Sequence, residues 1–323
     1  MKKILPMDIP ISETYQLASF LMGIMSQNKS VQKVLINSYI DLFFSQNDWG
    51  EKTLGFTESL CESYRTKGIG EMDLFYLKNI AKDKCLGFLK ERIDQDNYLL
   101  LYKIDEYELS YSFAYKKRHF IHDTYLFGYD DECFHVMAYS KNHLSLLRVP
   151  HQEIIDGLYS IVNDEFHFCS FRIYHDIKVR VNIKEILYQV EKYLSGGVNE
   201  QGETTGIWVY DCLMDLLIGT KIDKDEIRDI NPKLFRMLWE HKKMIVYRNQ
   251  YLAKKMNKLN TLTITAKNME QKASRIMMLI LKFNMSYDLD IIDRIEIYLK
   301  ELMDEEREYW LDFAGILSEG KKL

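Results

Sequence analysis

The chain has 323 residues, of which 47% are hydrophobic and 28% charged, a balance typical of a folded globular protein rather than a disordered one. Its net charge of −5 gives no overall positive field, which argues against nucleic-acid binding. Five cysteines without CxxC spacing argue against a disulfide framework or a zinc site, so we expect a cytoplasmic location. We also expect no signal peptide and no membrane span, because no apolar run has the required length.

The N-terminal part is predicted to be helical after an extended start. Ser12 and Thr14 are both good N-cap residues, so one of them is expected to precede the first helix. Apolar residues at helical spacing predict two further helices, over residues 31–44 and 73–92. The segment 45–70 between them shows no clear pattern.

From residue 98 the sequence changes to short apolar runs, which are typical of buried strands. The polar residues 129–132 separate two of these runs and are typical of a hairpin turn. A helix is predicted over residues 154–162. The expected strands cover residues 98–104, 122–128, 133–139, 144–149 and 165–174. These elements predict an α+β fold in which helices precede a mainly antiparallel sheet.

From about residue 181 the chain is predicted to be almost entirely helical. Asn231 and Pro232 mark a helix start, because Asn caps well and Pro suits the first helical position. A last helix is expected over residues 291–317, whose apolar residues have near-heptad spacing. The predicted domains are an α+β domain over residues 1–178 and a helical domain or extension over residues 179–323.

The most informative motif is the segment His119–Asp130, in which a histidine precedes a β-type run that ends in Gly-Tyr-Asp. Papain-like enzymes often mount their catalytic base in this way, on a strand that faces a nucleophile. His122, six residues before Gly128, resembles the histidine strand of papain-like peptidases that cleave double-glycine leader peptides. It is similar, more closely still, to the papain-like N-terminal domain of the butirosin biosynthesis acyltransferase. The resemblance covers residues 97–140.

This resemblance implies a papain-like core and the transfer of an acyl group from a carrier-protein thioester to an amine. Such reactions belong to nonribosomal-peptide and polyketide biosynthesis, so the implied partner is an acyl or peptidyl carrier protein. The nucleophile of the family lies before the histidine, but this chain has no cysteine before Cys61. The hydroxyls available near the first helix include Ser12 and Ser19, which are the candidate nucleophiles. An N-cap role for Ser12 and a packing role for Ser19 are the alternatives.

The third member of such a site is expected near residue 138 or 139, where the chain has Ala138 and Tyr139 instead of a carboxylate. Three interpretations therefore stay open. In the first, His122 acts as a general base with a substitute nucleophile or alone, since a thioester is already activated. In the second, the chain is a catalytically inactive papain-like scaffold that binds a carrier protein. In the third, the histidine strand is a coincidence in an unrelated α+β protein.

Further residues are expected to contact a substrate, either beside His122 or on the C-terminal helices. They are His119, Asp123, Asp105, Tyr139 and His241. His241 is also interpreted as a core or interface histidine; alternatively, the neighbouring Lys242 and Lys243 would present positive charge to a carrier protein. No metal-ligand spacing and no phosphate-binding glycine loop is present, so no cofactor is expected. The long C-terminal helices are expected to pack on the sheet or to form a homodimer.

Overall fold

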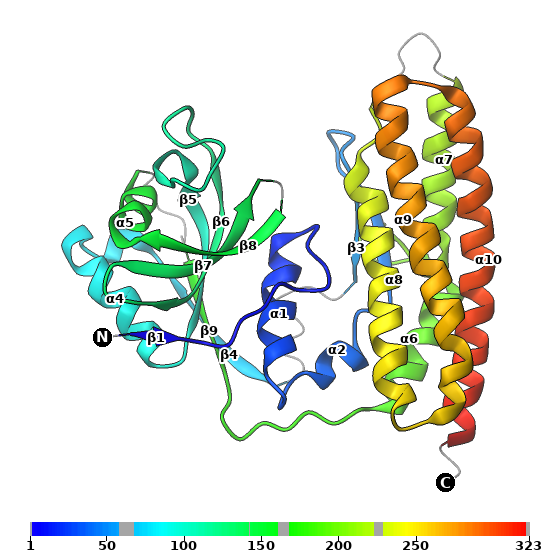
Figure 1. Ribbon diagram of the computed structural model, residues 1–323, viewed down its shortest axis with the longest axis horizontal. Coiled ribbons are helices and arrows are strands. Elements are labelled where there is room, and N and C mark those ends of the chain that lie inside the picture. Colours follow the sequence, from blue (N-terminus) through cyan, green and yellow to red (C-terminus); the bar gives the residue numbers. More distant parts are fainter. Residues whose placement is uncertain (1, 58–67, 142, 161–167, 223–228, 321–323) are drawn as a thin grey trace. The chain divides into compact units, whose positions relative to one another are not determined.

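The computed structural model describes residues 2–57, 68–141, 143–160, 168–222 and 229–320. The chain is a mixed α+β protein with antiparallel sheets and a helical C-terminal region, as predicted (Figure 1). It divides into two compact units, and each contains two segments of the chain. The first unit is Met1–Gln32 with Leu60–Val179, and the second is Lys33–Ser59 with Arg180–Leu323. The segment Lys33–Ser59, which the sequence placed in the first domain, therefore packs with the C-terminal helices.

The first unit is built on one antiparallel sheet with the strand order β4-β9-β5-β6-β7-β8, and β1 pairs with β6. Its strands are β1 (Lys3–Ile4), β4 (Gly70–Phe75), β5 (Tyr98–Asp105), β6 (Ile121–Tyr129), β7 (Cys133–Ser140), β8 (His143–Pro150) and β9 (Phe168–Ile173). Its helices are α1 (Gln16–Gln27), α4 (Lys82–Asp94) and α5 (His151–Tyr159), with 3-10 turns η1 (Leu77–Asn79) and η2 (Glu106–Glu108). The four strands from β5 to β8 follow the apolar runs of the sequence closely.

Helices cover both faces of this sheet (Figure 1). Helix α1 lies on one face, where the ring of Phe20 stacks on Tyr125 of β6 with centroids 4.3 Å apart. Helices α4 and α5 lie on the other face, where Phe88 of α4 contacts Phe168 of β9. Because successive side chains of a strand alternate between faces, Tyr125 and Thr124 of β6 point to opposite layers.

Two predicted helices in this unit were wrong in part. Helix α1 begins at Gln16, with Tyr15 in the N-cap position and no side-chain cap bond, so neither Ser12 nor Thr14 caps it. Residues 73–92 start as strand β4, and the helix begins only at Lys82. Strand β4 pairs with β9, which lies about a hundred residues further along the chain, so local periodicity carries no signal of it.

The second unit contains a small antiparallel sheet of order β10-β11-β2-β3 and a set of long helices. The strands are β2 (Leu42–Gln46), β3 (Lys52–Phe56), β10 (Gly197–Val198) and β11 (Thr204–Thr205). The helices are α2 (Lys33–Asn37), α6 (Ile183–Ser195), α7 (Val209–Ile222), α8 (Pro232–Ala253), α9 (Leu262–Ser286) and α10 (Leu289–Gly320), with 3-10 turns η3 (Gly206–Trp208) and η5 (Asn257–Thr261). The helix predicted over residues 31–44 is instead the short α2 followed by β2.

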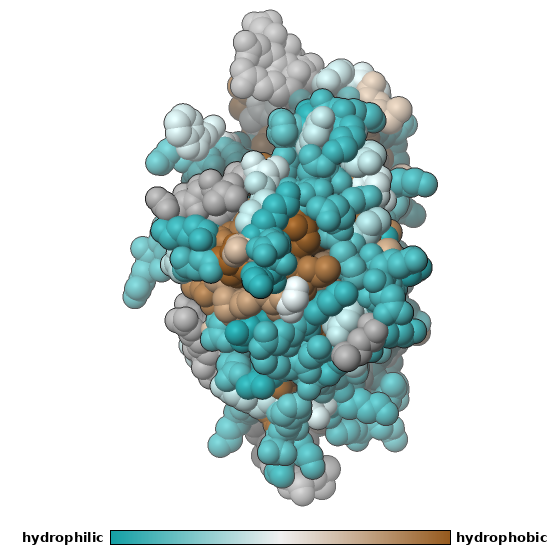
Figure 2. Space-filling model, turned by 90° about the vertical axis from the view of Figure 1, so that its left-hand side faces the viewer, coloured by the Kyte–Doolittle hydropathy of each residue, from teal (hydrophilic) through white to brown (hydrophobic). Residues whose placement is uncertain are grey.

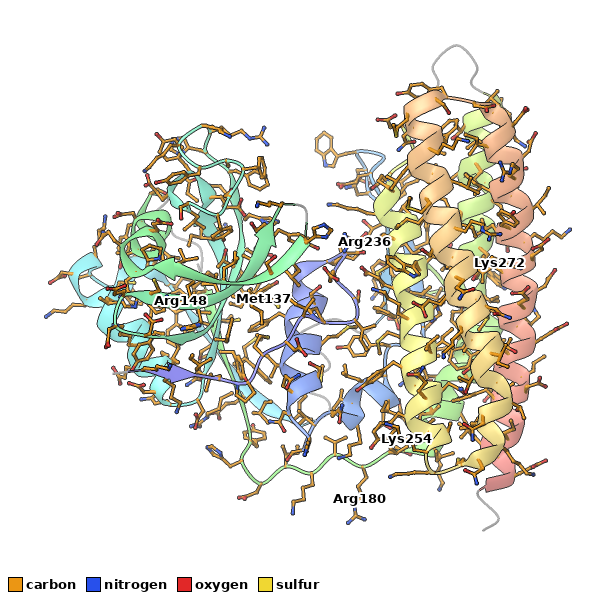
Figure 3. The ribbon with its side chains drawn as sticks, viewed as in Figure 1. Met137, Arg148, Arg180, Arg236, Lys254 and Lys272 are labelled. Carbon is orange, nitrogen blue, oxygen red and sulfur yellow. The ribbon has the colours of Figure 1, made fainter. Side chains whose placement is uncertain are left out.

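Helices α8, α9 and α10 pack on one another through apolar faces, which include the buried Ile295, Leu299 and Phe313 of α10. At the helix surface Lys272 of α9 binds Glu301 and Glu305 of α10 at 2.9 and 2.6 Å (Figure 3). Within the described ranges, none of the helices is long and apolar enough to cross a membrane.

Polar side chains fix the segment Lys33–Ser59 to the long helices. Arg248 of α8 is fully buried, and its Nε donates to the carbonyl oxygen of Ile36 at 2.9 Å. Its Nη2 donates to the carbonyl oxygens of Ser38 and Tyr39. One guanidinium thus binds three backbone carbonyl oxygens of this segment and fixes it to α8.

Candidate functional site

The predicted histidine strand is present as β6. Its first residues lie beside a carboxylate that follows the neighbouring strand β5. His122 lies near the start of β6 and pairs with Ile104 of β5. From one pairing position to the next, β5 advances by three residues, Leu101 to Ile104, while β6 advances by two, from Thr124 to His122. The bulge therefore lies in β5, and the side chains of β6 alternate regularly between these two positions. The chain then turns into η2, which begins at Glu106 and places this side chain next to the imidazole.

His122 and Glu106 form a hydrogen-bonded pair. His122 Nδ1 lies 2.9 Å from Glu106 Oε1, and the hydroxyl of Ser112 donates to the other carboxylate oxygen. Glu106 and Ser112 are buried, whereas the His122 side chain is 34% exposed. A carboxylate at Nδ1 favours the tautomer that carries its proton there, and this leaves the lone pair of Nε2 to accept a proton from a substrate.

A second histidine–carboxylate pair lies beside the first. His119 Nδ1 is 2.5 Å from Oδ2 of the fully buried Asp105, and the exposed imidazole stacks on Tyr107. Burial alone would raise the pKa of Asp105, but its hydrogen bonds outweigh this effect and lower it. The donors are His119, the backbone N–H groups of Tyr107 and Phe120, and the Ser160 hydroxyl. Asp105 therefore anchors the backbone that leads into β6 through the N–H group of Phe120.

Asp123 and Tyr139 are two further residues that were predicted to contact a substrate near His122. The ring centroids of His122 and Tyr139 are 6.4 Å apart. Burial raises the pKa of Asp123 to about 6, although the charge of His122 opposes this shift. By strand alternation Asp123 points to the face of Tyr125, so it contributes to the other side of the sheet.

The structure does not bring the two candidate serine nucleophiles to His122. The Ser19 hydroxyl donates to the carbonyl oxygens of Ser12 and Tyr15, both at 2.8 Å. Ser12 and Ser19 are buried beside α1, on the sheet face that Tyr125 occupies. His122 shares its face with Thr124, whose hydroxyl is hydrogen bonded to that of Tyr111. Ser19 therefore has a packing role, as one of the alternatives predicted.

The structure places His241, which was predicted to contact a substrate, in a different unit from His122. Its side chain is fully buried in the second unit, and its Nε2 lies 2.9 Å from the carbonyl oxygen of Ile40. Lys242 is equally buried and binds Glu306 of α10 at 2.6 Å. These two residues join elements within the core, which agrees with the interpretation of His241 as a core histidine, and Lys242 presents no charge at the surface. Lys243 is half-buried and lies over the ring of Trp239.

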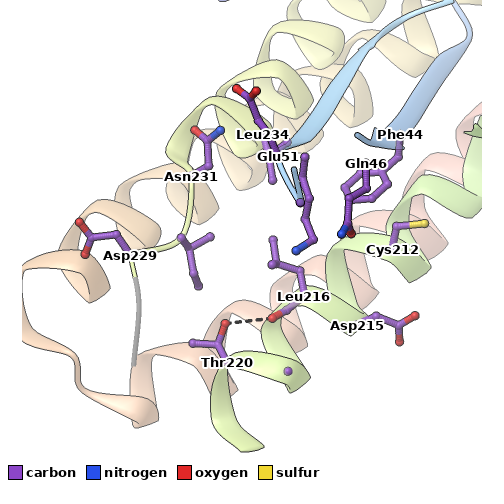
Figure 4. A pocket seen from close by; sticks show the side chains of 14 residues that line it. Phe44, Gln46, Glu51, Cys212, Asp215, Leu216, Thr220, Asp229, Asn231 and Leu234 are labelled. Atoms are coloured by element: carbon purple, nitrogen blue, oxygen red, sulfur yellow. Dashed lines mark hydrogen bonds between the residues drawn. The ribbon is translucent and has the colours of Figure 1, made fainter. Parts of the chain in front are cut away.

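The second unit also contains a cavity of about 690 Å³ between β2, β3, α7 and the start of α8 (Figure 4). Three of its polar side chains form contacts that serve local structure. Thr220 donates to the carbonyl oxygen of Leu216, Asp229 accepts from the Tyr287 hydroxyl, and Asn231 caps α8. None of the predicted site residues lines this cavity, and in the described part of the chain no group of three metal-ligating side chains exists.

Comparisons with known proteins do not identify a family for this chain. No protein-family model matches the chain, and no curated protein matches its sequence significantly. The sequence analysis did not identify Glu106 as the partner of His122, because the pairing depends on the register between β5 and β6 and on the bulge in β5. It also missed Ser112. A carboxylate directly after the strand that pairs with a histidine strand is the signal that would have identified Glu106.

Proposed function

We propose that the chain is an acyltransferase in which His122 acts as the general base in the transfer of an acyl group from a carrier-protein thioester to an amine. The observation that carries this proposal is the His122–Glu106 hydrogen bond with a half-exposed imidazole. A histidine held in one tautomer by a buried carboxylate is the arrangement that general-base catalysis requires. The four described cysteines are free thiols, which agrees with a reducing, cytoplasmic location.

The reaction needs no covalent enzyme intermediate. Nε2 of His122 takes a proton from the amine while the amine nitrogen attacks the thioester carbonyl. The tetrahedral intermediate then expels the thiolate, which recovers that proton from the imidazolium, so an amide and a free thiol are formed. Glu106 stabilises the imidazolium, and the Ser112 hydroxyl holds Glu106 in place. Because a thioester is activated, base assistance of about 100- to 10,000-fold is sufficient for this role.

A papain-like ancestry belongs to the same proposal. The first unit has an N-terminal helix, α1, before an antiparallel sheet that carries the histidine strand. Ser12 and Ser19, the candidate nucleophiles, lie beside α1 on the opposite sheet face from His122. We therefore propose a lineage in which the base was retained and the covalent step was lost.

The test uses purified full-length protein, acyl-pantetheine thioesters and a panel of primary amines, with thiol release and amide formation both measured. His122→Ala is expected to lower the rate by at least 100-fold, and Glu106→Gln by about 10- to 100-fold. His135→Gln is the matched control, since His135 also pairs with an aspartate, Asp130, at the other end of the same hairpin. Amide formation by His122→Ala at the parental rate would refute the assignment.

The burial of both candidate nucleophiles also favours a second function, an inactive scaffold that binds a carrier protein. In that case no variant or parental protein would release thiol from any thioester. A holo-carrier protein would nevertheless bind, with an affinity independent of His122.

A further inference from the structure

A line of four rings leads across the surface of the first unit to His122. The rings belong to Phe113, Phe120, His122 and Tyr139, and we call this line the ring strip. Its successive centroids are 5.3, 5.3 and 6.4 Å apart, so the rings are in contact along the whole line. Phe113, at the outer end, is 59% exposed. The strip is therefore an apolar track that starts in solvent and reaches the proposed base.

The outer end of the ring strip carries a guanidinium group. Arg118 Cζ lies 4.9 Å from the centroid of Phe113 and 5.7 Å from that of Phe120. These distances are those of cation–π contacts, which fix the plane of the group and leave its N–H donors for a ligand. Arg118 is exposed, and among the described residues it forms no ion pair.

Of the two lysines beside Arg118 in the chain, one forms an ion pair with a carboxylate. Lys116 is neutralised by an ion pair with Glu108, and it also lies over the rings of Tyr107 and Tyr115. Lys117 is exposed and, within the described ranges, likewise has no carboxylate partner. The chain as a whole is acidic, with a net charge of −5. Two uncompensated cations at one end of an apolar track thus form a local site for an anion that is attached to an apolar arm.

Figure 2 shows the side on which α4 and α5 lie. Polar residues cover most of this face, and apolar residues gather in one central area. A ligand that covers the exposed ring of Phe113 and the adjoining Arg118 would accept from the guanidinium donors and bury the ring.

We propose that Arg118 binds the phosphate of the phosphopantetheine arm of the substrate and that the ring strip receives the arm, with the thioester carbonyl beside Nε2 of His122. This inference rests on the proposed function and names the part of the carrier-bound substrate that the site recognises. Arg118 is a binding residue here, because it lies at the far end of the strip from the reacting carbonyl.

The experiment compares two thioesters that carry the same acyl group, one on phosphopantetheine and one on pantetheine, which lacks the phosphate. The parental protein is expected to have a KM about tenfold lower for the phosphorylated thioester, since one charge-assisted phosphate contact at an exposed site has about this effect. Arg118→Ala is expected to abolish the preference by raising the KM for acyl-phosphopantetheine to that for acyl-pantetheine. Arg118→Lys keeps the charge without the planar fork, so it should retain part of the preference.

Lys84→Ala is the matched control, because Lys84 is another exposed cation of the first unit and lies on α4. It should keep the full preference, which separates a specific contact from a general loss of positive charge. An equal KM for the two thioesters in the parental protein would overturn the inference while leaving the proposed function intact. A preference that survives in Arg118→Ala would also overturn it. A parental protein that turns over neither thioester would overturn the proposed function and, with it, the inference.

Discussion

The buried ion pair between Lys242 and Glu306 provides a sharp test of the second unit. Glu306 of α10 accepts hydrogen bonds from Lys242 Nζ at 2.6 Å, from the Tyr210 hydroxyl at 2.7 Å and from Trp310 Nε1 at 3.2 Å. Lys242 Nζ is also 2.9 Å from His241 Nδ1. Both charged side chains are fully buried, so neither can turn to water when its partner is removed.

The two single substitutions are expected to differ in magnitude. Glu306→Leu leaves the Lys242 ammonium without a counter-charge and two neutral donors without an acceptor, and removing one partner of a buried pair costs about 3–5 kcal/mol of the free energy of unfolding. Lys242→Met leaves a carboxylate that still accepts from Tyr210 and Trp310, so we expect a smaller loss of about 2–3 kcal/mol. In the double variant no charge remains unpaired, and its loss should fall short of the sum by about 2 kcal/mol.

Intrinsic fluorescence is the suitable assay. All four tryptophans, Trp49, Trp208, Trp239 and Trp310, lie in the second unit, so urea unfolding followed by their emission reports on this unit alone. Lys272→Met is the control, because Lys272 forms partly exposed ion pairs for which a loss of at most about 1 kcal/mol is expected. A loss below about 1 kcal/mol for Glu306→Leu, or strictly additive losses in the double variant, would refute this reasoning.

Three further substitutions test other parts of the chain. Burial, together with the charge of Lys242, holds the pKa of His241 well below its usual 6.5. The unfolded chain therefore binds the additional proton below pH 6.5. As the pH falls below this value, the free energy of unfolding of the second unit should decrease by up to about 1.4 kcal/mol per pH unit. His241→Gln should remove this slope in urea titrations at about pH 5 to 7. For Asp123 the sign is reversed: its pKa is raised to about 6 from 3.8, so the folded state holds the additional proton and stability falls as the pH rises through this window. Asp123→Asn should stabilise the first unit by about 1–2 kcal/mol at pH 7, after allowance for partial exposure, and leave it unchanged at pH 3; hydrogen exchange of β6 peptides at both pH values measures this. Arg248→Met should cost about 2–4 kcal/mol and accelerate amide exchange selectively in residues 36–41, and uniform exchange there would contradict its role as the clamp of this segment.

The candidate site shows how far local sequence carries a functional prediction. The motif around His122 identified the strand, the histidine and the hairpin that follows it, because strand periodicity and turn residues are local properties. The partner of the histidine was sought on β7, near Tyr139, whereas the structure provides Glu106 from the end of β5. Which neighbour supplies the carboxylate depends on strand register, and a single bulge in β5 changes it.

The sequence by itself determined the strands β5 to β8, the helical C-terminal half and the start of α8 at Pro232, since each has an apolar period or a cap that acts within a few residues. Only the tertiary structure decided that β4 is a strand, that Lys33–Ser59 packs with the C-terminal helices, and that Ser19 and His122 belong to opposite faces of one sheet. These outcomes depend on hydrogen bonds and burial between residues far apart in the chain. The free energy of those contacts outweighs local preference, and no window of neighbouring residues records it.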